Sequence, residues 1–185
     1  MDSAERAEGY CRAPVIVAFS GGIGSGKSSV SKLVAELIGW PRVSCGDYVR
    51  SVAMSRGLGL ERGDLQLLGA ELMADPTAFC KGVLDQANWE PGKSLLIDGI
   101  RHAEALDAIK VLVSPATTKS VFLGASSARR TEQTGIENME ELDSHSTELQ
   151  VSDLEHTADF VLDASQDPVS LAEQTATWIA SQDAV

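Results

Sequence analysis

A glycine-rich turn between two apolar segments constrains this 185-residue chain more than any other feature. Residues 21–28 are Gly-Gly-Ile-Gly-Ser-Gly-Lys-Ser, which fits the pattern G-x-x-x-x-G-K-[ST]. The β-rich run 14–19 precedes them, and residues 29–38 carry apolar side chains at helical spacing. Strand, glycine-rich turn and helix form the context in which this motif cradles phosphates. The alternative, an ordinary glycine turn, does not explain a lysine and a hydroxyl both in place.

The residue types in this segment predict contacts with a bound nucleoside triphosphate. Glycines let the backbone curl, so that consecutive N–H groups and the helix N-terminus point at the anion. Lys27 can reach the β- and γ-phosphates, and the Ser28 hydroxyl can ligate Mg²⁺. We therefore expect ATP and Mg²⁺ as cofactors. The residues expected to bind ATP are Gly22, Ile23, Gly24, Ser25, Gly26, Lys27, Ser28 and Ser29.

The distribution of charge narrows the choice of partners. The net charge is −12, and all 15 Lys and Arg residues lie at or before Arg130. Because affinity for nucleic acid rests on Lys and Arg displacing counterions, an acidic surface of this kind argues against a polymeric nucleic-acid partner. A few arginines in a cleft can still hold a small anionic substrate. We expect the first two-thirds of the chain to form that cleft.

Composition favours a cytoplasmic protein with one core. The length suits a single domain, and no apolar run approaches the about 20 residues of a membrane helix. Residues 1–13 lack an apolar stretch, so we expect a flexible leader rather than a secretory signal. Cys11, Cys45 and Cys80 show no metal-type spacing and no even pairing, which favours reduced thiols.

Alternating strand and helix patterns predict an α/β three-layer fold around the P-loop motif. Its five-stranded parallel sheet has helices on both faces, and residues 14–185 form one domain. The expected strands are 14–19, 41–44, 94–97, 120–123 and 160–162. The expected helices are 29–38, 46–55, 64–74, 77–87, 103–113, 126–133, 146–157 and 168–180, with Asp64 and Asp75 as N-terminal signals. Because ligands of such sheets lie beyond the carboxyl ends of the strands, segments 20–28, 44–47 and 98–101 should converge.

The segment Asp98-Gly99-Ile100-Arg101 follows a buried strand and predicts a second part of the site. In P-loop proteins, a carboxylate at this place holds Mg²⁺, directly or through water. Arg101 offers a forked donor for an anionic substrate or for the transferred group. The alternative for Asp98 is a cap on the following helix.

Residues 44–50, Ser-Cys-Gly-Asp-Tyr-Val-Arg, resemble a segment of the nucleoside monophosphate kinases of the adenylate kinase-like superfamily. Asp98-Gly99-Ile100-Arg101 is similar to a shortened form of that family's Asp-Gly-Phe-Pro-Arg segment. The resemblance implies that the three-layer fold is of P-loop kinase type. It also implies that Arg50 and Arg101 bind the acceptor phosphate, and that Cys45 and Asp47 line the acceptor pocket. The glycine-rich turn and residues 158–163 are also similar to dephospho-coenzyme A kinases.

Residues 62–69 resemble the Leu-Gln-x-x-Gly segment of phage-type deoxynucleoside monophosphate kinases. The resemblance implies acceptor-binding helices at about residues 46–90, with Gln66 on a base edge and Arg62 on a phosphate. The alternative is an exposed polar helix face.

Related kinases close a lid whose arginines clamp the transferring phosphoryl group, and here the lid would span about residues 126–150. Arg129 and Arg130 are the basic residues available to it. Dephospho-coenzyme A kinases carry a further arginine before position 150, where this chain has His145 and Glu148 in a segment that also fits a solvated helix start.

Together these features predict an ATP-dependent kinase that phosphorylates a (deoxy)nucleoside monophosphate. The predicted catalytic residues are Lys27, Arg101, Arg129, Arg130 and Asp47, the last as a base if the acceptor is a hydroxyl. The predicted acceptor-binding residues are Cys45, Asp47, Arg50, Arg62, Gln66 and Arg101, and the predicted metal-binding residues are Ser28 and Asp98. The alternatives are a hydroxyl-directed kinase, such as a dephospho-coenzyme A kinase, and a regulatory P-loop NTPase. The oligomeric state stays open.

Overall fold

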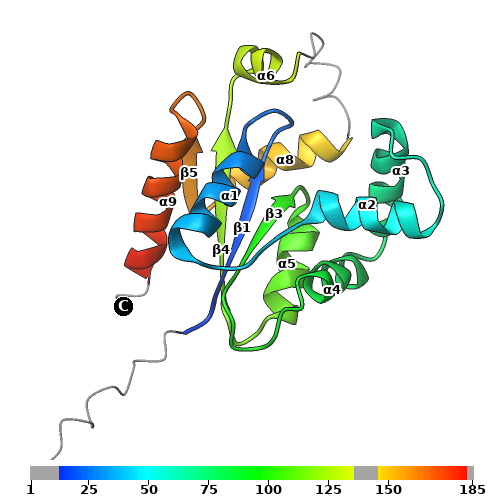
Figure 1. Ribbon diagram of the computed structural model, residues 1–185, viewed down its shortest axis with the longest axis horizontal. Helices are drawn as coiled ribbons and strands as arrows, with labels where there is room; N and C mark the ends of the chain where they lie inside the picture. The colour runs from blue at the N-terminus through cyan, green and yellow to red at the C-terminus, as the bar shows by residue number, and fades with distance from the viewer. Residues whose placement is uncertain (1–12, 136–145, 183–185) are drawn as a thin grey trace, which may run out of the picture.

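The computed structural model describes residues 13–135 and 146–182, with the backbone alone at residues 146–150 and 152. Five parallel strands form one sheet in the order β2-β3-β1-β4-β5 (Figure 1). The strands are β1 (Val15–Gly21), β2 (Arg42–Ser44), β3 (Leu95–Ile100), β4 (Thr117–Gly124) and β5 (Phe160–Asp163). The predicted fold class and the five-stranded parallel sheet are confirmed.

Helices connect the strands and cover both faces of the sheet. They are α1 (Lys27–Ile38), α2 (Cys45–Ser55), α3 (Arg62–Leu72), α4 (Pro76–Gln86), α5 (Ala103–Leu112), α6 (Ser127–Thr134), α8 (Ser146–Thr157) and α9 (Pro168–Gln182). In Figure 1, α6 lies near the end of the sheet where β1 runs into α1, and α2 and α3 lie at the side of β3.

The alternation of side chains along β1 divides the core into two layers. Val17 and Phe19 face α1 and α9, whereas Ile16 and Ala18 face α2, α4, α5 and α8. All four side chains are fully buried, as expected for the central strand of a parallel sheet covered on both faces. The two cores hold the strand ends in fixed register, and the site depends on that register.

The helix starts follow local sequence signals in most cases. The Ser44 side chain accepts a hydrogen bond from the backbone N–H of Asp47 at 3.3 Å, and Asp75 caps α4 through the N–H of Ala78 at 2.9 Å. Asp64 was predicted to start a helix, and that prediction is wrong. The helix α3 begins at Arg62, so that Asp64 lies in its first turn, where its charge still favours the helix dipole.

Two strands are longer than the sequence pattern predicts. β3 continues through Asp98 to Ile100, because Asp98 pairs with Ser44 of β2 and Phe19 of β1, and Ile100 pairs with Ser20. β4 begins at Thr117, which pairs with Val15. These strand ends carry polar side chains, so the apolar runs in the sequence did not predict them. Asp98 therefore lies inside the ladder, and its backbone is held on two sides.

The closing helix packs as expected. Trp178 of α9 stacks on Phe160 of β5 with ring centroids 4.9 Å apart, so that its indole covers one edge of the core. In the described part of the chain, no helix combines the length and the apolarity needed to cross a bilayer.

Candidate active site

The glycine-rich turn leaves β1 at Gly21 and enters α1 at Lys27. Gly21, Gly24 and Gly26 have φ angles of 143°, 74° and 87°, which disfavour any residue with a Cβ. The N–H of Ser25 donates to the carbonyl of Gly22 at 3.2 Å and closes the turn. This curled backbone has the shape that the motif predicts for a phosphate cradle.

Lys27 lies over the turn that precedes it. Only 7% of the residue is exposed, and its Nζ donates to the Gly22 carbonyl at 3.2 Å. The first helical residue thus brings its ammonium group back to the start of the loop. A cation in this position faces the space where the loop N–H groups would hold phosphates.

Ser28 and Asp98 lie side by side, as predicted for the metal-binding pair. The Ser28 hydroxyl donates to Asp98 Oδ2 at 2.7 Å, although the residues are 70 positions apart. Asp98 Oδ1 is buried and makes no hydrogen bond within the described residues. An exposed hydroxyl beside a buried carboxylate, one oxygen of which has no hydrogen-bond partner within the described residues, fits the oxygen ligands that Mg²⁺ prefers.

In the described part of the chain, no cluster of three or more His, Cys, Asp or Glu side chains could hold a metal ion. This fits Mg²⁺, which keeps several waters and binds through one or two protein groups together with substrate phosphates. Ser28 and Asp98 are the side chains that would hold it.

Arg42 is a site residue that was not predicted from the sequence. Its Nη2 donates to Asp98 Oδ2 at 2.7 Å, and its Nε donates to Ser31 Oγ at 2.8 Å. A single arginine in a three-residue strand gives no periodic signal. The one available sign was a charge in a segment that otherwise predicts a buried strand.

Helix α6 places one of the two candidate lid arginines against the phosphate loop. Arg130 is buried, and its Nη1 lies 2.8 Å from where a Cβ on Gly22 would be. Arg129 is exposed instead, and its Nη1 forms an ion pair with Glu132 Oε2 at 3.1 Å. The structure therefore brings Arg130, and not Arg129, to the loop.

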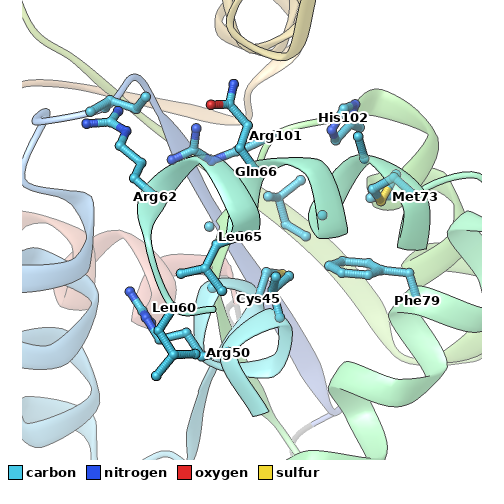
Figure 2. A pocket seen from close by; sticks show the side chains of 18 residues that line it. Cys45, Arg50, Leu60, Arg62, Leu65, Gln66, Met73, Phe79, Arg101 and His102 are labelled. Carbon is cyan, nitrogen blue, oxygen red and sulfur yellow. The ribbon is translucent and has the colours of Figure 1, made fainter. Parts of the chain in front are cut away.

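A pocket of about 510 Å³ lies next to the loop, and Ile23 of the loop contributes to its wall. It contains five of the six predicted acceptor-binding residues: Cys45, Arg50, Arg62, Gln66 and Arg101. Its apolar walls, which the sequence analysis did not identify, include Leu65, Met73 and Phe79. In Figure 2 the three labelled arginines lie toward one side, and Met73 and Phe79 lie toward the other.

The formally charged side chains that line the pocket are all positive among the described residues. Three arginines and His102 line it, and none of its described lining residues is an aspartate or glutamate. In a chain of net charge −12, this cleft gathers positive charge in one place. Such a pocket attracts small anions through its local field.

Asp47 differs from the prediction. It is not among the described residues that line the pocket, and its carboxylate forms an ion pair with Arg50, three residues further along α2. Both side chains are more than half exposed. The ion pair forms because i and i+3 residues are neighbours on a helix surface.

Burial makes the two described cysteines poor nucleophiles. Burial raises the pKa of the Cys45 thiol far above its usual value, and the nearby Cys80 and Asp98 raise it further. Burial also raises the pKa of Cys80 to about 11. Both thiols are free, in agreement with the reduced state predicted for them. Cys45 therefore contributes shape, rather than charge, to the pocket. Cys11, His145 and the side chain of Glu148 lie outside the described residues.

Residues 20–143 match the family described as AAA domain. The chain belongs to this AAA-domain family. A UPF0200 protein from Aeropyrum pernix is 33% identical to it over 95 residues, which are 51% of this chain and 51% of the relative. The match thus spans about half the length of that relative.

Solved structures show that the chain has the fold of P-loop kinases. A gluconokinase from Sinorhizobium meliloti 1021 superposes with a TM-score of 0.59 at 20% identity, over 93% of this chain and 95% of that one. The shikimate kinase from Aquifex aeolicus gives 0.59 at 15% identity, over 90% and 97%. The shikimate kinase from Acinetobacter baumannii, in complex with shikimate, gives 0.56 at 18% identity, over 92% and 94%.

Proposed function

We propose that this protein is an ATP-dependent kinase that transfers the γ-phosphoryl group to the phosphate of a (deoxy)nucleoside monophosphate. The observation that carries the proposal is the arginine-rich pocket beside the phosphate loop, which holds no carboxylate among its described lining residues. Phosphoryl transfer passes through a loose, anionic transition state, so positioning and charge neutralisation account for most of the catalysis.

The phosphate loop and two cations would hold the donor. The loop N–H groups and Lys27 bind the phosphates, and Arg130 covers the loop from α6. Ser28 and Asp98 would hold Mg²⁺, which, when bound, neutralises charge on the phosphates. Arg129 is left to a surface role by its ion pair with Glu132.

Arg101 and Arg50 would hold the acceptor phosphate. Arg101 directly follows β3, which pairs with β1, the strand that leads into the phosphate loop. Arg50 projects from α2 into the same pocket as Ile23 of the loop. A guanidinium donates two parallel hydrogen bonds to a phosphate and fixes its orientation.

The far side of the pocket suits a planar base. Phe79 is buried and packs edge-on against Tyr48, with ring centroids 5.5 Å apart, so its ring is held in place. Leu65 and Met73 extend the apolar wall, while Gln66 offers an amide to a base edge. Apolar walls with a few polar groups are typical of small-molecule sites.

The alternatives are a hydroxyl-directed kinase, such as a dephospho-coenzyme A kinase, and a regulatory NTPase. A hydroxyl acceptor would require a base, and the candidate Asp47 is engaged by Arg50 outside the pocket lining. A phosphate is already a nucleophile at neutral pH. A regulatory NTPase would not need a cationic pocket beside its loop.

The test is to measure ADP formation from ATP with a panel of acceptors, with the products identified by mass spectrometry. The panel holds ribo- and deoxyribonucleoside monophosphates, dephospho-coenzyme A, gluconate and shikimate. We expect a nucleoside diphosphate product from at least one monophosphate, and none with Lys27→Ala, whose missing cation acts on the transition state. ATP hydrolysis without any acceptor product, or transfer to hydroxyl acceptors alone, would overturn the proposal.

A further inference from the structure

Arg42 contacts the predicted metal-binding pair, Ser28 and Asp98, through the carboxylate of Asp98. It reaches from β2 across the sheet to Asp98, and a second contact to Ser31 of α1 fixes its guanidinium. The Asp98 side chain is 2% exposed and that of Arg42 is 19% exposed, so the ion pair is largely shielded from water. Ser31 itself is fully buried.

The two oxygens of Asp98 have different surroundings. Oδ2 accepts hydrogen bonds from both Arg42 and Ser28, each at 2.7 Å, whereas Oδ1 accepts none within the described residues. The carboxylate is thus held in one orientation by a charged donor. The same donor cancels its formal charge at short range.

We propose that Arg42 is a positioning residue that neutralises Asp98, so that the nucleotide-free protein binds a free divalent cation only weakly. The cation then enters the site together with the nucleotide. The nucleotide phosphates supply the negative charge that attracts the cation, because Arg42 neutralises the charge of Asp98. This inference rests on the donor half of the proposed function and is independent of the acceptor.

The physical reason is electrostatic. A cation near Ser28 and Asp98 experiences attraction to the carboxylate and repulsion from the guanidinium bonded to the same carboxylate. Both charges act at short range in a shielded place, where screening by salt is weak. The uncharged variant Arg42→Gln would leave a buried carboxylate without its counter-ion, and a divalent cation can take that role.

The test is a titration of nucleotide-free protein with Mn²⁺, in which electron paramagnetic resonance measures the concentration of the free ion at each step. We expect Arg42→Gln to bind one Mn²⁺ at least about tenfold more tightly than the wild type. Asp98→Asn in the Arg42→Gln background should abolish the gain. Arg56→Gln is the matched control, because Arg56 forms an exposed ion pair with Glu71 on another part of the molecule.

The variant Arg42→Lys keeps the positive charge and changes the geometry of the contacts. It also provides a test if the neutral variant Arg42→Gln does not fold. We expect Arg42→Lys to bind free Mn²⁺ as weakly as the wild type does, with a lower melting temperature, because lysine cannot contact Ser31 and Asp98 together. Circular dichroism checks the fold of each variant.

A second measurement leaves Arg42 unchanged and compares the Mn²⁺ affinities of the wild type and Asp98→Asn. We expect the two proteins to bind free Mn²⁺ equally weakly, while Mn²⁺–ATP binds the wild type more tightly. Tight, Asp98-dependent Mn²⁺ binding to the nucleotide-free wild type would overturn the inference, as would equal Mn²⁺ affinities for wild type and Arg42→Gln. A donor site that binds no Mn²⁺–ATP at all would instead overturn the proposed function.

Discussion

Arg130 of α6 covers Gly22 of the phosphate loop so closely that its Nη1 lies 2.8 Å from the place of a Cβ on that glycine. The same helix lies over Gly24, where a Cβ would be 2.6 Å from the Thr134 methyl and 3.1 Å from the Arg130 carbonyl. The glycines of the loop thus serve two purposes. They let the backbone curl around phosphate, and they make room for the arginine above it.

Gly22→Ala should lower the turnover of the kinase by about tenfold or more, because the added methyl pushes the Arg130 guanidinium away from the phosphates. The contact is with the end of a flexible side chain, so the midpoint of urea unfolding should change little. Gly63→Ala is the control, since a Cβ there meets nothing within 4 Å. Unchanged turnover in Gly22→Ala would contradict the role of Arg130.

Arg101→Ala and Arg50→Ala should each lower kcat/KM for the acceptor roughly tenfold to a hundredfold and leave the KM for ATP nearly unchanged. Lysine should rescue either site poorly, because it offers a point charge instead of a fork. Steady-state kinetics with both substrates varied provide the measurement, with Arg56→Ala as the control. Equal losses for ATP and acceptor would argue against an acceptor clamp.

Gly82→Ala should destabilise the fold by about 1–3 kcal/mol through overpacking. A Cβ on this residue of α4 would lie 2.1 Å from the Tyr48 hydroxyl and 2.4 Å from the ring carbon that bears it, and the ring is packed against Phe79. Urea unfolding measures the loss. Combining it with Tyr48→Ala should remove most of the extra cost, and a purely additive double variant would show that Tyr48 is not the obstacle.

The stability of the protein should fall as the pH rises above about 9, in part because of Cys80. Burial raises the pKa of this thiol from 9.0 to about 11. Between these values the unfolded chain loses the proton while the folded protein keeps it, so a rise in pH favours unfolding. Cys80→Ala should flatten this part of the profile of unfolding free energy against pH. An equally steep decline in the variant would assign the effect to other groups.

The sequence predicted the fold because one motif and the alternation of strand and helix patterns agree with each other. Convergence of the strand ends also followed from topology, and the Ser28–Asp98 hydrogen bond confirms it. The role of Arg42 could not be predicted, because its partners come from α1 and β3 and meet only in the folded chain.

The choice between Arg129 and Arg130 also required the structure. Neighbouring residues on a helix point about 100° apart, and the sequence does not say which direction faces the loop. Packing decides that Arg130 is buried and Arg129 is exposed. Asp47 was misplaced for a similar reason, since its local ion pair with Arg50 competes with the pocket for its side chain.

The sheet ends in a three-residue strand on one side and a four-residue strand on the other. Asp159 directly precedes β5 and Asp163 is its last residue, and Asp159 accepts hydrogen bonds from the backbone N–H and the hydroxyl of Ser120 at 2.8 and 3.0 Å. Short edges with carboxylates offer little unpaired backbone to an approaching strand. At high concentration this sheet should therefore resist edge-to-edge aggregation.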